Sequence, residues 1–396
     1  MLNWKKAVFY LIFSLGSQNL FAKPLDVSIE AESAILINAT TGAVLYKKNS
    51  QKQQFPASIT KVATALYALS VKGDKLGELV SAEQEAIASL SEAAIKRSNY
   101  KLPSYYIEQG SSHIGIKKGE ELKFSDLFYG MLLPSANDAS NVIAQFVSGS
   151  IPLFVEEMNA YLKTIGCKNT HFCNPHGLHH PDHLTTAEDM ALIAKKALEN
   201  PFFCDVVKSV RFTRPKTNKQ EASTLVQLNK LLKKGSYFYE KAIGIKTGHT
   251  SFALNTFVGA AREGERTLIA VVLKVKERGD IFEDTTKLFE AAFKEQKVEK
   301  VFVQKGKQKF ILNHNSAEKP VETYAEKAFS ITYYPAEEPE IKSFLKWDEV
   351  QFPIVKGQKV GELIIQNITL NKEKHIALYA EEDIKQSWGS WFKSCF

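Results

Sequence analysis

The stretch Phe55-Pro56-Ala57-Ser58-Ile59-Thr60-Lys61, followed by an apolar run to Leu69, decides how this chain folds. Apolar residues recur through the run at helical spacing, which predicts an amphipathic helix with one buried face. Pro56 stands just ahead of the run and is a helix-start signal. Ser58 and Lys61 would then lie one turn apart on one side of the helix. The apolar positions are Ile59, Val62, Ala63, Leu66 and Leu69.

Ser58 and Lys61 have the residue types of a nucleophile and its base. A serine hydroxyl attacks at neutral pH only when a base takes its proton, and a lysine can be that base where desolvation and nearby cations lower its pKa. Free backbone N–H groups at the helix N-terminus would favour developing negative charge. Because the S-x-x-K spacing is common by chance, this tetrapeptide alone favours an ordinary amphipathic helix with a surface lysine.

Composition narrows the class of protein. The chain has 396 residues, 44% of them apolar and 24% charged, as in a globular protein long enough for two domains. Its net charge of +7 is mildly basic, but no cluster of basic and aromatic residues or nucleic-acid motif accompanies it. We therefore expect no nucleic-acid binding, and a polyanionic surface such as a membrane or cell wall fits the charge better.

The first 22 residues have the pattern of a signal peptide. Lys5 and Lys6 precede an apolar run over residues 7–13, and a plausible cleavage site follows Ala22. The apolar run is too short to span a bilayer comfortably, which argues against an uncleaved anchor. We expect an exported protein.

Cysteines and histidines in the chain lack metal-ligand spacing. Cys167 and Cys173 are close enough in sequence to bridge, although the spacing leaves this undecided, and Cys204 and Cys395 have no obvious partner. Four histidines gather in a proline-bounded loop without the helical context of a zinc site. We interpret them as solvated loop histidines and expect neither a metal nor a cofactor. They are His176, His179, His180 and His183.

Apolar periodicity predicts an α+β domain over residues 23–297, in which helices pack on an antiparallel sheet. Pro134 divides one long helical pattern and places Ser135-Ala136-Asn137 on a turn between two helices. The predicted strands are 34–37, 43–46, 243–248, 253–261 and 267–275, and the predicted helices are 58–69, 124–147, 153–165, 187–198 (opened by a Thr185–Glu188 capping box) and 282–293.

From about residue 298 the pattern changes to short strands separated by turns, which predicts a small all-β sandwich domain over residues 298–383. This part contains no candidate pair of nucleophile and base, so we assign it no chemistry.

Three short motifs carry the chemistry: Ser58-Ile59-Thr60-Lys61, Ser135-Ala136-Asn137 and Lys246-Thr247-Gly248. Each is weak alone, but three in this order are strong together. The chain resembles the low-molecular-mass penicillin-binding proteins, serine-type D-alanyl-D-alanine carboxypeptidases. The resemblance spans residues 28–293 and extends to the stretches 174–178 and 186–191. It implies a penicillin-binding-protein/β-lactamase-like transpeptidase domain that acts on the D-Ala-D-Ala stem peptides of peptidoglycan and is inhibited by β-lactam antibiotics. It also implies a peripheral protein at the periplasmic face of the bacterial inner membrane.

The resemblance also implies catalytic roles. Ser58 would attack the carbonyl between the two D-alanines and form an acyl-enzyme, and Lys61 would take its proton. Ser135 would pass a proton to the leaving amine, with Lys246 sustaining a positive field.

Substrate binding would fall to the neighbouring residues. Asn137 would hydrogen-bond the substrate amide, and Lys246 with Thr247 would hold the terminal carboxylate. The backbone N–H groups of Ser58 and His249 would form the oxyanion hole. Gly248 would let the substrate lie against the strand without a side chain in the way.

The sequence departs from the family at three places: Ala136 stands where glycine is common, Leu228 replaces an arginine, and residues 85–105 look long. A class A-type β-lactamase would need a Glu-x-x-Leu-Asn carboxylate, which we do not find between Asn137 and Lys246. A non-catalytic cell-wall or penicillin-binding module would be expected to have lost a motif serine or lysine. A D,D-endopeptidase remains an open alternative.

The last 13 residues, 384–396, predict an amphipathic helix that lies on a membrane surface. Its apolar positions fall on one helical face, with lysines on the other side. A tail whose aromatic residues pack back on the β domain is the alternative. The apolar positions are Ile384, Trp388, Trp391, Phe392 and Cys395.

Overall fold

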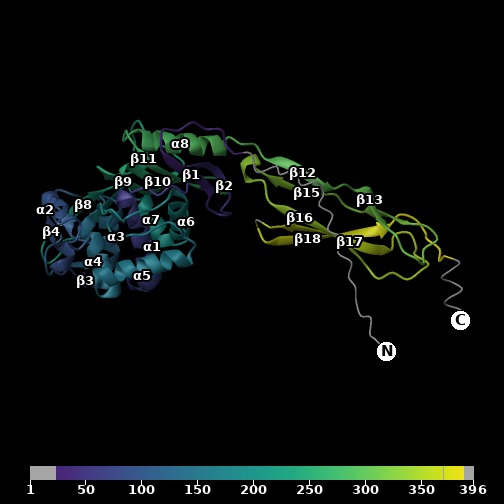
Figure 1. The fold of residues 1–396 in the computed structure, drawn as a ribbon, viewed down its shortest axis with the longest axis horizontal. Coiled ribbons are helices and arrows are strands. Elements are labelled where there is room, and N and C mark those ends of the chain that lie inside the picture. Colours follow the sequence, from purple (N-terminus) through teal and green to yellow (C-terminus); the bar gives the residue numbers. More distant parts are fainter. Residues whose placement is uncertain (1–23, 369, 388–396) are drawn as a thin grey trace, which may run out of the picture. The chain divides into compact units, whose positions relative to one another are not determined.

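The protein is seen in a computed structural model that describes residues 24–368 and 370–387. The chain divides into two compact units, one over residues 25–294 and one from Glu295 onward (Figure 1). The sequence places this boundary three residues later, after residue 297. We call the first the catalytic unit and the second the β unit.

A five-stranded antiparallel sheet forms the centre of the catalytic unit, in the order β2-β1-β11-β10-β9. The two middle strands are apolar and buried along almost their whole length because helices cover both faces of the sheet. The strands are β1 (Ser33–Asn38), β2 (Val44–Lys48), β9 (Ala242–Thr250), β10 (Leu254–Glu263) and β11 (Arg266–Val275). All five predicted strands are confirmed.

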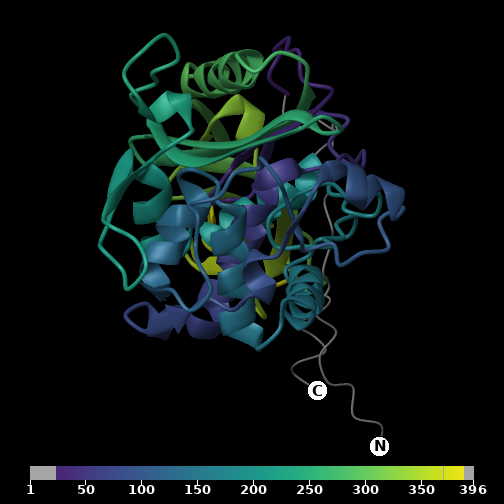
Figure 2. The same cartoon turned by 90° about the vertical axis from the view of Figure 1, so that its left-hand side faces the viewer.

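Helices cover the two faces of this sheet. Helix α8 packs on one face, against β10 and β11, and α6 packs on the other, against β1 and β11, with α1 behind α6 (Figures 1 and 2). The helices are α1 (Thr60–Lys72), α2 (Glu92–Arg97), α3 (Phe124–Leu132), α4 (Asn137–Ser148), α5 (Ile151–Thr164), α6 (Ala187–Ala197), α7 (Pro201–Lys208) and α8 (Asp280–Phe293).

The predicted helices are confirmed, with one correction at a cap. Pro134 does divide α3 from α4, and Ser135 lies in the connection. Helix α6 is capped by Thr186, whose side chain accepts from the Asp189 backbone N–H. The predicted capping box of Thr185 and Glu188 is therefore one residue too early. Thr185 instead pairs with Gln54 in a β-bridge.

Several short elements carry no periodic signal and were not predicted. Six of these elements are short strands that form three two-stranded sheets, β3 with β6, β4 with β5, and β7 with β8. The remaining elements of the unit are η1 (Ala57–Ile59), η2 (Gly73–Lys75), β3 (Leu79–Ser81), η3 (Glu85–Ile87), β4 (Ser89–Leu90), β5 (Ile107–Glu108), β6 (Glu121–Lys123), β7 (Arg211–Arg214), β8 (Ser223–Val226) and η4 (Lys230–Leu232).

The β unit consists of a five-stranded sheet, β13-β14-β18-β17-β16, and a two-stranded sheet, β12-β15. Val303 of β12 and Phe329 of β15 pack with Leu363 and Ile365 of β17, so the two sheets share a core as the sandwich prediction requires. The elements are β12 (Val298–Val303), β13 (Gly306–Leu312), β14 (Val321–Ala325), β15 (Phe329–Tyr333), η5 (Pro335–Glu337), β16 (Ile341–Trp347), β17 (Lys359–Asn367) and β18 (Lys372–Ala380).

The start of the predicted membrane tail belongs to the β unit. Ile384 forms a β-bridge with Ile354, is 1% exposed and packs in an apolar cluster with Val321 and Val360. Assigning Ile384 to a membrane-facing helix is therefore wrong, because this side chain is already covered by the β unit. The predicted positions Trp388, Trp391, Phe392 and Cys395 lie outside the described residues, as does the predicted signal peptide. Within the described ranges, no helix is both long and apolar enough to cross a bilayer.

Candidate active site

Ser58 lies on a tight turn that leads into α1. The turn η1 ends at Ile59, and Ala57 before the serine has a left-handed φ of 53°. Lys61, one turn further, extends its Nζ to 3.2 Å from the Ser58 Oγ. The helix-start position and the pairing that the sequence predicts for these two side chains are both present in the structure.

Lys61 is completely buried, and its amine is surrounded by oxygen atoms. Nζ donates to the Asn137 Oδ1 at 2.7 Å and to the main-chain oxygen of His176 at 2.6 Å. Burial, reinforced by the nearby charge of Lys246, holds the pKa of Lys61 well below its usual range. A neutral amine has two N–H bonds, which these two carbonyl oxygens accept. Its lone pair is then left facing the Ser58 hydroxyl.

The α3–α4 connection supplies Ser135 and Asn137. Ser135 is 3% exposed and has a left-handed φ of 70°, and its Oγ has no hydrogen-bond partner among the described residues. A buried hydroxyl without a partner is rare, so Ser135 is available to a group that enters the site. The Asn137 amide links Lys61 to the wall of the site, because its Nδ2 donates to the Ser111 Oγ at 2.9 Å.

Strand β9 is the edge strand of the sheet and carries Lys246, Thr247, Gly248 and His249. Lys246 is 1% exposed, and its Nζ donates to the Thr247 main-chain oxygen at 2.8 Å. Burial, together with the nearby charge of Arg278, lowers the pKa of Lys246 to about 7. His249 is exposed, and its Nδ1 lies 3.1 Å from the Asn255 Oδ1.

Gly248 brings β9 against the serine turn. A Cβ at this position would come within 2.9 Å of the Ser58 backbone nitrogen and 3.0 Å of the Pro56 oxygen. The protein's own backbone therefore requires a glycine here, a reason different from the substrate clearance inferred from the sequence. This close approach brings Ser58 next to His249. The backbone N–H groups of these two residues are the predicted oxyanion hole.

The histidine loop is built differently from the sequence-based interpretation. His176 and His183 are fully buried, so describing all four as solvated is wrong for these two. His183 accepts from the Cys173 backbone N–H through Nδ1, and its Nε2 lies 2.8 Å from the Thr60 Oγ1. Burial lowers the pKa of both imidazoles, that of His176 to about 3, so both remain neutral.

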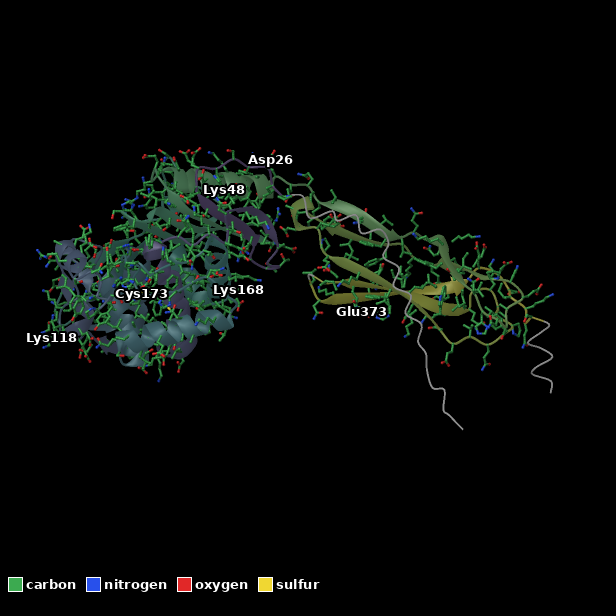
Figure 3. The ribbon with its side chains drawn as sticks, in the orientation of Figure 1. Asp26, Lys48, Lys118, Lys168, Cys173 and Glu373 are labelled. Atoms are coloured by element: carbon green, nitrogen blue, oxygen red, sulfur yellow. The ribbon has the colours of Figure 1, made fainter. Side chains whose placement is uncertain are left out.

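The histidine loop packs closely against the turn that carries Ser58. Gly177, with a φ of 89°, approaches the Ala57 oxygen so closely that a Cβ would lie 2.0 Å from it. Cys173, labelled in the catalytic unit in Figure 3, is partly exposed, and its thiol is free, as are those of Cys167 and Cys204. Cys167 and Cys173 are therefore not bridged.

The sequence does not reveal two groups that position the catalytic side chains. The Ser111 hydroxyl accepts a hydrogen bond from Asn137, and the His176 main-chain oxygen accepts one from Lys61. Neither has a signal in the sequence, since a main-chain carbonyl has no residue type and Ser111 lies in an irregular segment.

Among the residues that the structure describes, no group of three or more His, Cys, Asp or Glu side chains is arranged to hold a metal ion.

Comparison with known proteins identifies the family. Residues 18–277 match the peptidase S11 profile, described as D-alanyl-D-alanine carboxypeptidase. The chain belongs to this family of serine D-alanyl-D-alanine carboxypeptidases. The D-alanyl-D-alanine carboxypeptidase DacF of Bacillus subtilis is 32% identical over 376 residues, which are 91% of this chain and 88% of that protein.

Solved structures of carboxypeptidases and transpeptidases share the fold. Penicillin binding protein 5 from Haemophilus influenzae is 26% identical with a TM-score of 0.60, covering 91% of this chain and 99% of that one. The DD-transpeptidase of a Streptomyces strain is 28% identical with a TM-score of 0.58, covering 68% of this chain and 98% of that one. The predicted family and fold class are thereby confirmed.

Proposed function

We propose that this carboxypeptidase removes the terminal D-alanine from peptidoglycan pentapeptide stems through an acyl-enzyme on Ser58. The observation that carries the proposal is the fully buried Lys61 amine, 3.2 Å from the Ser58 Oγ. A lysine with a lowered pKa next to a serine is the arrangement that makes a hydroxyl nucleophilic at neutral pH.

Acylation begins when the neutral Lys61 Nζ accepts the Ser58 proton. The Ser58 Oγ bonds to the carbonyl carbon, and the carbonyl oxygen takes the negative charge. The backbone N–H groups of Ser58 and His249 stabilise that charge, an effect worth ~3–4 kcal/mol for a lost donor in a well-studied protease. When the C–N bond breaks, the Ser135 hydroxyl gives its proton to the leaving D-alanine amine and receives the proton held by Lys61, so both side chains return to their starting state. Water then hydrolyses the ester and releases Ser58.

The two buried lysines divide the work. Lys246 and Thr247 hold the terminal carboxylate of the substrate, the charge that distinguishes a carboxypeptidase substrate from an internal peptide bond. Because the pKa of Lys246 is about 7, an arriving carboxylate favours its protonated form. The positive charge of Lys246 in turn disfavours protonation of Lys61, which keeps the base neutral.

Penicillins would acylate the same serine, because they present a strained amide and a carboxylate to the same groups. A class A-type β-lactamase activity is less well supported. The loop over residues 174–178 offers Lys61 the main-chain oxygen of His176 where such an enzyme needs a water-activating carboxylate.

A penicillin adduct tests the nucleophile. Mass spectrometry of the protein after benzylpenicillin treatment should show the penicilloyl mass on the peptide that contains Ser58, and Ser58→Ala should remove it. Ser70→Ala is the matched control, since it deletes an exposed hydroxyl at the far end of the same helix. An adduct that persists in Ser58→Ala would refute the assignment.

Product analysis then separates the reactions open to this family. A pentapeptide ending in D-Ala-D-Ala should yield free D-alanine and the tetrapeptide. Release of a peptide from cross-linked dimers at a higher rate would instead identify an endopeptidase.

We also propose that the protein is exported before it acts. Support comes from the basic and apolar pattern of residues 1–22 and from the location of peptidoglycan outside the cytoplasm. N-terminal sequencing of the protein from a secreting host should give a new terminus close to Lys23, and an intact Met1 would contradict export by cleavage.

A further inference from the structure

His183 is a buried titratable residue that the proposed reaction does not use. Its side chain is 1% exposed, and the imidazole stacks on Phe172 with the ring centres 4.9 Å apart. Both ring nitrogens have partners. Nδ1 accepts from the Cys173 backbone N–H at 2.9 Å, and Nε2 lies 2.8 Å from the Thr60 Oγ1. Because these partners belong to separate segments, they hold the ring in one orientation.

The partners of His183 also determine the direction of its hydrogen bonds. Burial lowers the pKa of His183 well below its usual range, so the imidazole is neutral and has a single N–H group. Since the Cys173 N–H donates to Nδ1, this proton is on Nε2, which therefore donates to the Thr60 Oγ1. The Thr60 hydroxyl in turn donates its own proton to the Ala57 main-chain oxygen at 2.9 Å. A chain of hydrogen bonds thus leads from His183 through Thr60 to Ala57.

The Ala57 oxygen belongs to the peptide group that also contains the Ser58 backbone N–H. A trans peptide group is planar, so its C=O and N–H point in opposite directions. On the oxygen side, a Cβ at Gly177 would lie 2.0 Å from the Ala57 oxygen. On the nitrogen side, a Cβ at Gly248 would lie 2.9 Å from the Ser58 nitrogen. A group that holds the Ala57 oxygen therefore also orients the N–H that the oxyanion hole needs.

The turn before Ser58 needs such support. Ala57 has a left-handed φ of 53°, which is unfavourable for a residue with a Cβ and persists only where the surrounding structure holds it. The preceding carbonyl, that of Pro56, accepts from the Thr256 Oγ1 of β10 at 2.8 Å. Two successive carbonyls of the turn are thus held by threonine hydroxyls, and the one at Ala57 is held by a hydroxyl that His183 itself orients.

We propose that His183 is a positioning residue for the oxyanion hole. Acting through the Thr60 hydroxyl, it fixes the Ala57 carbonyl and so orients the Ser58 backbone N–H toward the developing negative charge. This contribution belongs to the transition state rather than to substrate binding, because the oxyanion forms only during acylation. The inference rests on the proposed function, which assigns the Ser58 N–H to the oxyanion hole.

Two substitutions at Thr60 test the last link of the chain. Thr60→Val keeps the shape of the side chain but removes the hydroxyl, so the rate constant of acylation by benzylpenicillin should fall about 10- to 100-fold, less than for a complete loss of an oxyanion-hole donor. Thr60→Ser keeps the hydroxyl and should stay within about threefold of the unmodified rate. Stopped-flow labelling also gives the dissociation constant of the complex that precedes acylation, which should change less than about twofold in both variants.

A double-mutant cycle tests whether His183 acts through Thr60. His183→Asn keeps an acceptor in place of Nδ1 but has no group in place of Nε2, so acylation should slow about 3- to 10-fold, as expected for the loss of one neutral hydrogen bond. In a Thr60→Val background the same substitution should change the rate less than about twofold, because the hydroxyl through which it acts is already absent.

Thr64→Val is the matched control on the same helix. The Thr64 hydroxyl is as buried as that of Thr60 and donates to the Pro175 main-chain oxygen of the histidine loop at 2.6 Å. Its loss weakens the packing of α1 on that loop but leaves the Ala57 carbonyl held, so the acylation rate constant should stay within about twofold. An equal loss in Thr64→Val and Thr60→Val, additive losses in the cycle, or a Thr60→Ser as slow as Thr60→Val would overturn the proposal.

The fraction of protein labelled separates positioning from misfolding. A misfolded variant loses sites, whereas a variant with a misdirected N–H keeps its sites and is labelled slowly. Thr60→Val should therefore reach the stoichiometry of the unmodified enzyme, and fewer sites with an unchanged rate constant would contradict positioning. The pH of half-maximal acylation should also be unchanged, since a shift would attribute the loss to a displaced Lys61.

The same labelling distinguishes the two levels of the argument. Absence of labelling in the unmodified enzyme would refute the proposed function. Normal labelling of the unmodified enzyme, with His183→Asn and Thr60→Val both acylated at its rate, would refute the positioning role of His183 alone.

Discussion

The two units of this chain differ in how many polar side chains they bury. In the catalytic unit, Lys61, Lys246 and His176 are each almost or fully buried. Of the buried polar side chains in the described residues, only Thr323 belongs to the β unit. Charged residues of the β unit pair at the surface, as Lys307 does with Glu322 at 2.5 Å.

The catalytic unit uses its buried polar groups for chemistry, whereas the charged groups of the β unit stay at the surface and favour solubility. A charge that loses its hydration either finds partners or gives up its proton, so burial changes the pKa of the lysines around Ser58. An exposed pair keeps its hydration and contributes little to stability. The catalytic unit therefore depends on each buried group, and the β unit depends on its apolar clusters.

The largest effect is expected at Lys61. Lys61→Met keeps an unbranched side chain of similar length but removes the base, so acylation by benzylpenicillin should slow by about 100- to 10,000-fold. Stopped-flow acylation rates measure this. Lys72→Met, which removes a lysine from the other end of α1, should leave the rate within about twofold. A near-normal rate in Lys61→Met would show that burial of this amine serves packing alone.

A stability difference comes next. Glu120 is 0% exposed, and its Oε1 accepts from Arg214 at 3.2 Å and from Thr217 at 2.7 Å. Glu120→Gln leaves the buried Arg214 without a counter-charge, which should destabilise the catalytic unit by about 3–5 kcal/mol. The corresponding change in the β unit, Lys307→Gln, should leave its unfolding midpoint unchanged.

Separate probes can follow the two units in urea. Loss of penicillin labelling reports on the catalytic unit, and fluorescence of Trp347 in β16 reports on the β unit. Equal sensitivity of the two units to loss of one ion-pair member would contradict the comparison.

The sequence predicted the sheet and the helices that flank the motifs, because period and turn residues determine these elements locally. It also predicted the pairing of Ser58 with Lys61, since three residues on one helix fix their separation. Polar contacts between distant segments could not be predicted in this way. His183 is buried because Thr60 and the Cys173 N–H satisfy its two nitrogens, and these partners are known only once the loop is folded.

The same limit applies to the walls of the site. Nothing in the sequence around Ser111 shows that this residue approaches Asn137, since the segment has no apolar period and is held by side chains of α4. Gly248 shows a further limit. A glycine in a strand indicates a close approach, but only the structure shows that Ser58 is what approaches it.

Lys246 should give a smaller effect that depends on pH. Its pKa of about 7 means that the amine is protonated below that pH and loses its charge above it. Only the protonated form attracts the substrate carboxylate. The ratio of kcat/KM for a peptide with a free terminal carboxylate to that for its amide should therefore fall about 10-fold as pH rises from 6 to 8.

Taking this ratio cancels the pH dependence of Lys61, which affects both peptides equally. In Lys246→Ala the ratio should be low and independent of pH. A ratio that varied with pH in the absence of Lys246 would assign the carboxylate contact to another group.

The smallest effect concerns residues 388–396, for which we propose reversible binding to a membrane surface. Ile384 belongs to the core of the β unit, so a truncation that removes it would damage that core and confuse the result. The informative comparison is the full chain against one that ends at Ser387. The residues removed contain two tryptophans and a lysine but no acidic residue, which favours contact with anionic lipid.

Full-length protein should pellet a few-fold more with vesicles containing phosphatidylglycerol than with neutral vesicles, and added salt should reduce the difference. Because the truncation removes no residue of the catalytic unit, penicillin labelling should be unchanged. Equal pelleting of the two forms would mean that this surface attraction, unlike the buried chemistry around Ser58, plays no part in holding the enzyme near its substrate.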